Sequence, residues 1–226
     1  MSAWLLTMLA VVASPVARAQ SLPTSAPTAA GFIPKGYRVL PEGSATGDLN
    51  ADGRPDLVLA LAPMPNIEAG PAPATNDNIP FPRLLVVLWR TATGYEQAYV
   101  ARQAILGRND GGAFGDPFAG LSITKGVLSI NHYGGSRWRW SLTAKFRYQQ
   151  GDFYQIGETY SLMQSAAENC PRLPDHRPGD LYRDINLLTG AYESVKVSDD
   201  CKLLENKHSK QLVKRLRRLV AYQPQP

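Results

Sequence analysis

The sequence predicts an all-β domain, an antiparallel meander of hairpins closed into a propeller-like or barrel-like body, with a basic C-terminal helix. Short runs of β-branched and aromatic residues alternate with turns that contain glycine, which is typical of hairpins. The longest run, residues 137–148, alternates apolar and polar side chains with period two, as a half-buried antiparallel strand does. After Ser209 the spacing of leucine and valine becomes helical.

The N-terminal residues 1–19 have the pattern of a secretory signal peptide. Residues 4–12 form a short apolar core, and Ala17-Arg18-Ala19 supplies the small-x-small cleavage pattern, although no Lys or Arg precedes the core. We therefore expect a periplasmic or secreted protein. Residues 20–31, rich in Ser, Thr, Ala and Pro, are expected to be a flexible lead-in.

The β domain is expected to span residues 32–201, and its elements follow one another with short turns. The first strands are predicted at residues 36–40 and 57–61, before a Pro-rich insertion at residues 62–82. Four hairpins follow, each turning at a glycine. Their strands are predicted at residues 84–89 with 95–101, 121–123 with 127–131, 138–148 with 153–160, and 185–188 with 192–197.

Residues 48–56, Asp-Leu-Asn-Ala-Asp-Gly-Arg-Pro-Asp, have the spacing of a calcium loop. Calcium takes six or more oxygen ligands at about 2.3–2.6 Å, so alternate residues must converge while the backbone turns at Gly53. An EF-hand would place a bidentate glutamate where Leu59 stands. The predicted ligands of this structural Ca2+ are the side chains of Asp48, Asn50, Asp52 and Asp56 and the carbonyl of Arg54. The alternative is a turn that binds no metal.

Residues 47–57 resemble the calcium loop of FG-GAP and VCBS repeats, which occur in integrin-type β-propellers and in many secreted bacterial proteins. This resemblance implies calcium binding and does not specify an activity. Such families carry several copies of the loop, whereas this chain carries one.

The two cysteines, Cys170 and Cys201, form an even pair in one exported domain, which favours a disulfide. In the chain-entropy model, closing this loop stabilises the fold by roughly 3–4 kcal/mol. The alternative is a zinc site that includes His176 or His208, but a paired C-x-x-C spacing is missing.

Positive charge is concentrated at the C-terminus. The chain carries +5; residues 202–226 contribute +6 and Arg18 contributes +1, so residues 20–201 carry −2. The basic tail, residues 202–226, is predicted to be a helix that docks its apolar stripe on the sheet. The alternative is an amphipathic segment that contacts an anionic membrane or wall polymer. Nucleic acid is not expected as a partner, because an exported domain whose body is near neutral lacks the positive net charge of nucleic-acid-binding proteins.

Two loops contain groups that could carry chemistry. Residues 107–118 are rich in glycine and include Asp110 and Asp116, but they lack the G-K-[ST] ending of a phosphate loop, so a structured turn is expected. A wall or polysaccharide hydrolase is the alternative function. It would use His132 with Ser136, although no G-x-S-x-G elbow is present, or Glu158 paired with Asp152 or Asp116.

The favoured function is a non-enzymatic binding module of the bacterial cell envelope that uses the hairpin at residues 132–140. Tyrosine, arginine and tryptophan, which often dominate binding energy, are concentrated there. The predicted partner-binding residues are Tyr133, Gly134, Gly135, Ser136, Arg137 and Trp138. A Gly/Ser loop in an exported calcium-binding β protein resembles periplasmic calcium-binding inhibitors of lysozyme-like enzymes. This resemblance implies a loop that enters the hydrolase cleft. A calcium-stiffened adhesion protein is a further alternative.

Overall fold

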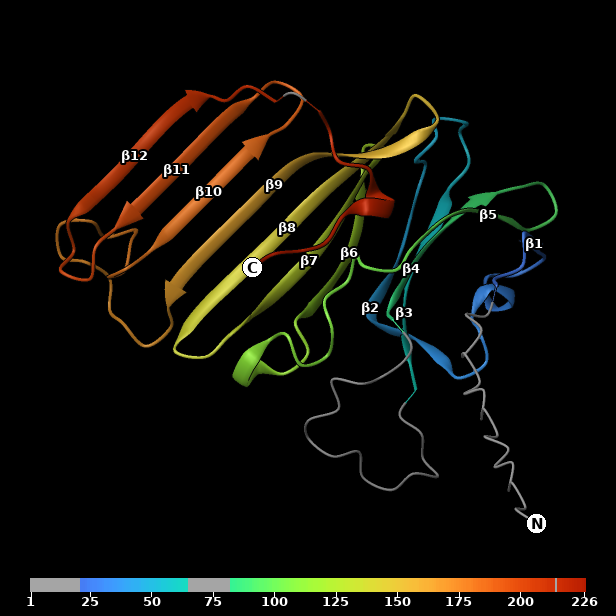
Figure 1. The fold of residues 1–226 in the computed structure, drawn as a ribbon, viewed down its shortest axis with the longest axis horizontal. Helices are drawn as coiled ribbons and strands as arrows, with labels where there is room; N and C mark the ends of the chain where they lie inside the picture. The colour runs from blue at the N-terminus through green and yellow to red at the C-terminus, as the bar shows by residue number, and fades with distance from the viewer. Residues whose placement is uncertain (1–20, 65–81, 214) are drawn as a thin grey trace, which may run out of the picture.

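The computed structural model describes residues 21–64, 82–213 and 215–226, which form two antiparallel sheets (Figure 1). The first sheet has the strand order β1-β5-β4-β3-β2, and the second has the order β12-β11-β10-β9-β8-β7-β6. The first contains β1 (Ser25–Ala26), β2 (Tyr37–Gly47), β3 (Asp56–Pro63), β4 (Leu84–Arg90) and β5 (Tyr95–Ala101). The second contains β6 (Phe118–Thr124), β7 (Val127–Gly135), β8 (Trp138–Gln149), β9 (Asp152–Gln164), β10 (Leu181–Asn186), β11 (Ala191–Val197) and β12 (Leu203–Lys210).

The main hydrophobic core lies between the two sheets. Val58 and Val87 of the five-stranded sheet share it with Ile130 and Phe146 of the seven-stranded sheet. A second core covers the other face of the first sheet, where Phe32 from the 3-10 helix η1 (Ala29–Phe32) is fully buried. Strand β3 is therefore buried on both faces, which explains its uninterrupted apolar sequence.

The all-β antiparallel prediction is confirmed, but the predicted closure into a propeller or barrel is wrong. Both sheets are open: the seven-stranded sheet ends at β6 and β12, and the other ends at β1 and β2. Strands β10, β11 and β12 continue beyond the region that the first sheet covers (Figure 1), and neither core cluster includes a residue from them. The chain therefore forms a two-layer core with a single-layer extension.

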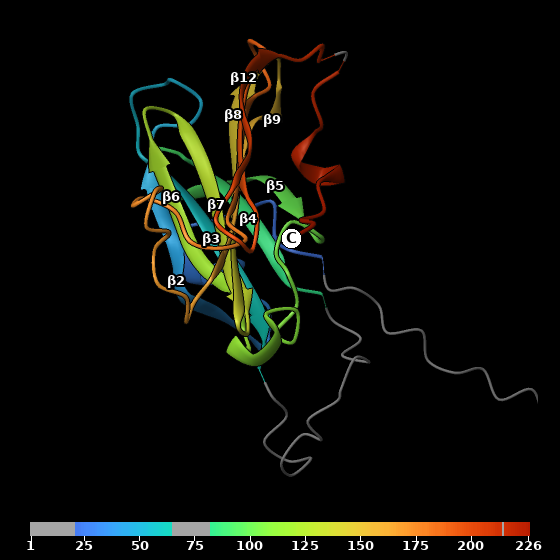
Figure 2. The same ribbon diagram turned by 90° about the vertical axis from the view of Figure 1, so that its left-hand side faces the viewer.

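The predicted C-terminal helix is also wrong, because the described residues contain no α-helix. Strand β12 extends the sheet to Lys210, and the chain then runs extended to the 3-10 helix η4 (Leu219–Ala221). Strand β10 pairs with β9 only as far as Gly157, so the Gln155 N–H is available and donates to the Arg217 carbonyl at 2.8 Å. Figure 2 shows β8, β9 and β12 as one thin layer, with this segment to one side.

The predicted strand at residues 185–188 is displaced, because β10 ends at Asn186. The Asn186 side-chain oxygen accepts the N–H groups of Leu188 and Thr189, at 3.0 and 3.1 Å, and this begins the turn earlier. The predicted signal peptide and most of the Pro-rich insertion lie outside the described residues. The described residues include no helix that is long and apolar enough to cross a bilayer.

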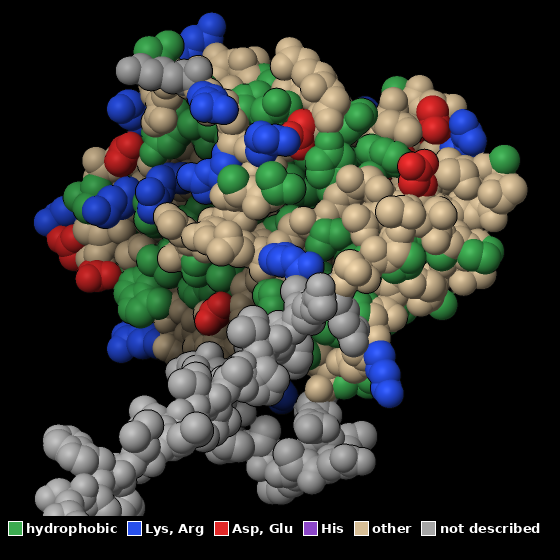
Figure 3. All heavy atoms as spheres, turned by 45° about the vertical axis from the view of Figure 1, so that its right-hand side comes forward, with side chains coloured by type: hydrophobic (Ala, Val, Ile, Leu, Met, Phe, Trp, Pro, Cys, Tyr) green, Lys and Arg blue, Asp and Glu red, His purple; other side chains and the backbone are tan. Residues whose placement is uncertain are grey.

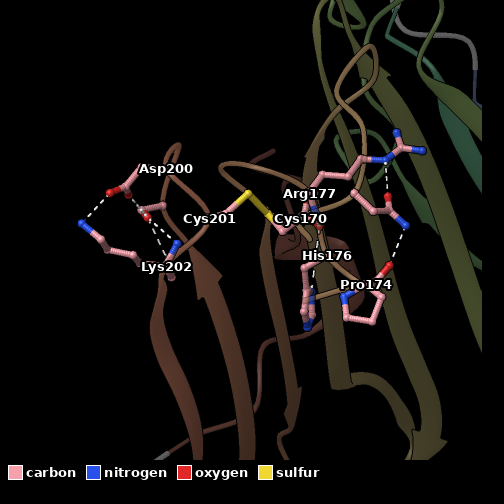
Figure 4. Close-up of a disulfide and its surroundings, with 10 residues drawn as sticks. Cys170, Pro174, His176, Arg177, Asp200, Cys201 and Lys202 are labelled. Carbon is pink, nitrogen blue, oxygen red and sulfur yellow. Dashed lines mark hydrogen bonds and ion pairs between the residues drawn. A yellow bond between two sulfur atoms is a disulfide. The ribbon is translucent and has the colours of Figure 1, made fainter. Parts of the chain in front are cut away.

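The predicted disulfide between Cys170 and Cys201 is confirmed (Figure 4). It joins the loop after β9 to the turn between β11 and β12, and so fastens the single-layer extension. The zinc alternative is wrong for these two cysteines, because both sulfur atoms are bonded to each other.

Candidate functional site

The glycine-rich loop at residues 107–118 meets the end of the β7–β8 hairpin. The N–H of Tyr133 donates to the Pro117 carbonyl, and the N–H of Gly135 donates to the Gly111 carbonyl, both at 2.8 Å. A Cβ at Gly134 would lie 2.9 Å from the Cα of Gly111, so a larger residue at position 134 would disrupt this contact. The glycines therefore allow two backbone segments to pack directly against each other.

Phe114, Tyr133 and Arg139 form an exposed stack at this junction, which we call the Phe114 platform. Phe114 belongs to the 3-10 helix η3 (Gly112–Phe114) and remains 51% exposed. The Arg139 guanidinium lies 3.8 Å from the centre of the Phe114 ring, and the Tyr133 ring meets Phe114 edge-on at 5.3 Å. Arg139 also donates to the Gly135 carbonyl at 3.2 Å, and this hydrogen bond helps to hold its guanidinium over the Phe114 ring.

An ion pair between Arg83 and Asp116 supports the platform from within. Arg83 donates through both terminal nitrogens to the Asp116 carboxylate and also to the Leu106 carbonyl at 2.9 Å. Burial raises the pKa of Asp116, but the Arg83 guanidinium and the Phe118 N–H outweigh burial and hold the pKa below its ordinary value. The pair therefore fastens the glycine-rich loop to the start of β4.

His132 lies beneath the same loop and is only 2% exposed. Its Nε2 accepts the Leu106 N–H at 3.2 Å, and burial, with a smaller contribution from Arg83, lowers its pKa to about 4. Ser136, in contrast, is exposed at the hairpin turn. The predicted His132–Ser136 pair is therefore not brought together, and His132 acts as a neutral hydrogen-bond acceptor inside the fold.

The carboxylates proposed for a hydrolase each contact a different partner. Asp116 binds Arg83, Asp152 pairs with Arg218, and Glu158 accepts from the Gln155 side chain at 2.8 Å. Among the residues that the structure describes, three or more His, Cys, Asp or Glu side chains nowhere gather closely enough to hold a metal ion.

The six predicted partner-binding residues are divided between two surfaces. Tyr133 belongs to the Phe114 platform, Ser136 and Arg137 are exposed at the turn, and Gly134 is buried against the Trp140 ring. Because side chains alternate along β8, Trp138 points to the opposite face of the sheet from Arg139. Phe114, Arg139 and Arg83 were not predicted as site residues; the only signal near them in the sequence is the glycine content of residues 107–118.

The loop at residues 48–56 turns where the calcium-loop spacing predicts. Gly53 has φ +81°, and its N–H donates to the Asp48 carboxylate at 2.9 Å. Asn50 accepts the N–H of Asp52 at 3.1 Å, and Asp52 accepts the N–H of Arg54 at 2.8 Å. The Arg54 N–H is the largest contribution that lowers the pKa of Asp52. These side-chain oxygens thus gather around one turn.

Asp56, the last residue of this loop, points into the protein interior and accepts hydrogen bonds from backbone groups there. It is fully buried, and its two oxygens accept the N–H groups of Leu49 at 2.9 Å and of Arg90 at 3.0 Å. Burial raises its pKa, since only backbone groups offset the loss of water. Each of these oxygens has a second lone pair, so Asp48, Asn50, Asp52 and Asp56 are of the donor type that a hard cation such as Ca2+ prefers. In the described structure, however, their carboxylates are not close enough together to hold an ion.

The loop at residues 48–56 and the Phe114 platform lie at opposite ends of β7. Gly126, in the turn before β7, lies next to residue 48, because a Cβ there would be 3.4 Å from the Asp48 carbonyl oxygen. Gly135 is the last residue of β7, and its N–H donates to the Gly111 carbonyl.

Comparison of the chain with protein-family models, with curated proteins and with solved structures finds no match.

Proposed function

We propose that this protein is an exported, non-enzymatic module of the bacterial cell envelope that binds a protein partner. The recognition surface is the Phe114 platform together with the exposed turn at Ser136 and Arg137. In its most specific form, the partner is a lysozyme-like enzyme that cleaves peptidoglycan. Glycosidase clefts contain a pair of carboxylic residues, so the Arg137 guanidinium supplies a complementary charge.

The observation that carries this proposal is the stack of Arg139 and Tyr133 on the exposed Phe114 ring. Aromatic residues and arginine supply most binding hot spots. Here backbone hydrogen bonds between residues 107–118 and β7 fix the two segments that carry the stack, and the Arg139 side chain donates to the Gly135 carbonyl. Binding then loses little side-chain entropy, which favours a tight complex.

Calcium has a structural role in this proposal. The side chains of Asp48, Asn50, Asp52 and Asp56 and the Arg54 carbonyl would hold the ion between β2 and β3. Since this loop lies at the far end of β7 from the Phe114 platform, the ion would stabilise the domain without touching the partner.

An inhibition assay tests the function. The mature protein, meaning residues 20–226 without the expected signal peptide, should inhibit peptidoglycan hydrolysis by at least one member of a panel of lysozymes from different structural classes. Arg137→Ala and Arg139→Ala should each weaken inhibition by about 30-fold, the equivalent of a 2 kcal/mol hot spot. Arg147→Ala is the matched control, because Arg147 is exposed at the other end of β8.

Three results would contradict the proposal. The first is a panel in which no lysozyme is inhibited. The second is an equal loss of inhibition in the Arg147 and Arg139 variants, which would show that positive charge alone is responsible. The third is cleavage of peptidoglycan by the protein itself, which would support the hydrolase alternative.

A further inference from the structure

The end of β9 and the single-layer extension share one face on which aromatic and cationic side chains lie side by side. Tyr160 of β9, Arg183 of β10, Ser194 of β11 and Lys207 of β12 are directly opposite one another in the strand register, so they share a face. The Arg183 guanidinium lies 5.3 Å from the centre of the Tyr160 ring. We call this surface the Tyr160 face.

Neighbouring rows of the same register extend the Tyr160 face in both directions. On β11, Lys196 lies two residues after Ser194 and is paired with Leu181 of β10 and Glu205 of β12. Tyr192 lies two residues before Ser194 and is paired with Ile185 of β10. Arg183, Lys196 and Lys207 are exposed, and none of the ion pairs among the described residues includes them. Figure 3 shows Lys and Arg side chains among hydrophobic ones over this part of the molecule.

A shallow cavity of about 450 Å³ opens at one corner of the Tyr160 face. Trp138 and Leu162 form its apolar wall, and Lys196, Ser198 and Asp199 supply polar groups. A Cβ at Gly179 would lie 2.2 Å from the Trp138 ring, so the glycine allows the indole to lie directly against the backbone. The cavity therefore combines a fixed aromatic ring with hydrogen-bonding groups and a cation.

We propose that the Tyr160 face and this cavity bind an acidic glycan, a chain of carboxylated sugars such as uronic acids. The C–H faces of sugar rings would pack on Trp138, Tyr160 and Tyr192. Sugar carboxylates would pair with the three cations, and hydroxyls would bond to Ser198 and Asp199. Arg183, Lys196 and Lys207 outnumber the two acids of the same face, Glu158 and Glu205, so charge complementarity favours an anionic chain. The shallow cavity offers no deep pocket for the hydrophobic anchor of a protein.

The dimensions of the face agree with an extended ligand. Neighbouring strands are about 4.8 Å apart, so a chain that crosses from β9 to β12 spans about 14 Å before it reaches the sheet edge. The site is separate from the recognition surface of the proposed function, because Arg139 points to the opposite face of the sheet from Trp138. The inference therefore goes beyond that function.

Calorimetric titration of the mature protein with oligogalacturonate tests the inference. Binding is expected, whereas a neutral maltooligosaccharide of equal length and a poly-glutamate peptide should bind at least tenfold more weakly. Lys207→Glu should weaken oligogalacturonate binding by at least tenfold. Lys210→Glu is the matched control, because it makes the same charge change on the same strand but on the opposite face.

The inference is overturned if oligogalacturonate does not bind, or if Lys210→Glu weakens binding as much as Lys207→Glu does. Equal binding of poly-glutamate would also overturn it and would point to an acidic protein instead. Lys207→Glu should leave lysozyme inhibition unchanged, and Arg139→Ala should leave oligogalacturonate binding unchanged. The two proposals can therefore fail separately.

Discussion

Asp56 joins the calcium loop to the interior of the fold. Its carboxylate is buried among backbone donors, and burial raises its pKa above the ordinary 3.8. The folded state therefore holds a proton on Asp56 more tightly than the unfolded chain does. As pH rises through 3.8 and then through the raised folded pKa, the ionised group increasingly reduces stability, and this cost remains at neutral pH. A cation in the loop would offset it.

Calcium is expected to raise the melting temperature of the mature protein relative to the same protein in chelator. Free calcium at about 100 times its Kd adds about 2.7 kcal/mol, which corresponds to about 5–10 °C for a chain of this size. Asp52→Asn should reduce the response, because it removes a ligand charge from the loop. Asp175→Asn, an exposed aspartate outside the loop, should retain it. An unchanged melting temperature in calcium would disprove the loop assignment.

The C-terminal segment is the element that differs most from the sequence prediction. Leu219 and Tyr222 are buried in the main core, and the Tyr222 ring packs on Phe146 at 5.0 Å. Burial raises the pKa of Tyr222. Arg218 pairs with Asp152 of β9. The segment therefore packs against the main core in an extended conformation and does not form a separate helix.

Leu219→Ala is expected to reduce the free energy of unfolding by about 2–5 kcal/mol, because it creates a cavity in the core. Val220→Ala serves as the control, since Val220 is 42% exposed and its truncation should cost less than about 1 kcal/mol. Urea unfolding of both variants measures the difference. Equal, small losses would show that the segment does not dock in solution.

At the scale of the whole molecule, the two sheets separate three features in space. The calcium loop lies at one end of β7, and the Phe114 platform lies at the other. The Tyr160 face lies on the end of β9 and on the single-layer extension, which the Cys170–Cys201 disulfide fastens at its outer strands. The proposed calcium site and the two proposed recognition surfaces therefore lie on different parts of the fold.

Most strands from β2 to β11 could be predicted from sequence, because alternation and turn glycines are local signals. Strands β1 and β12 were not predicted, since they lie in residues that were expected to be a flexible lead-in and a basic helical tail. Strand β8 (Trp138–Gln149) lies close to the predicted residues 138–148. The helix was wrongly predicted, because the leucine spacing after Ser209 does not reveal that β9 offers a free edge to Arg217. Phe114 was missed for a similar reason. Its role depends on Arg139, 25 residues away in sequence, and only the tertiary fold brings the two together.

Hydrogen–deuterium exchange of the mature protein, alone and saturated with a lysozyme that it inhibits, tests the central claim most directly. The recognition surface predicts slower exchange of backbone amides in residues 111–118 and 133–139, while the calcium loop at residues 48–56 remains unchanged. Protection confined to other parts of the chain, with those two segments unaffected, would contradict the claim that the Phe114 platform binds the partner.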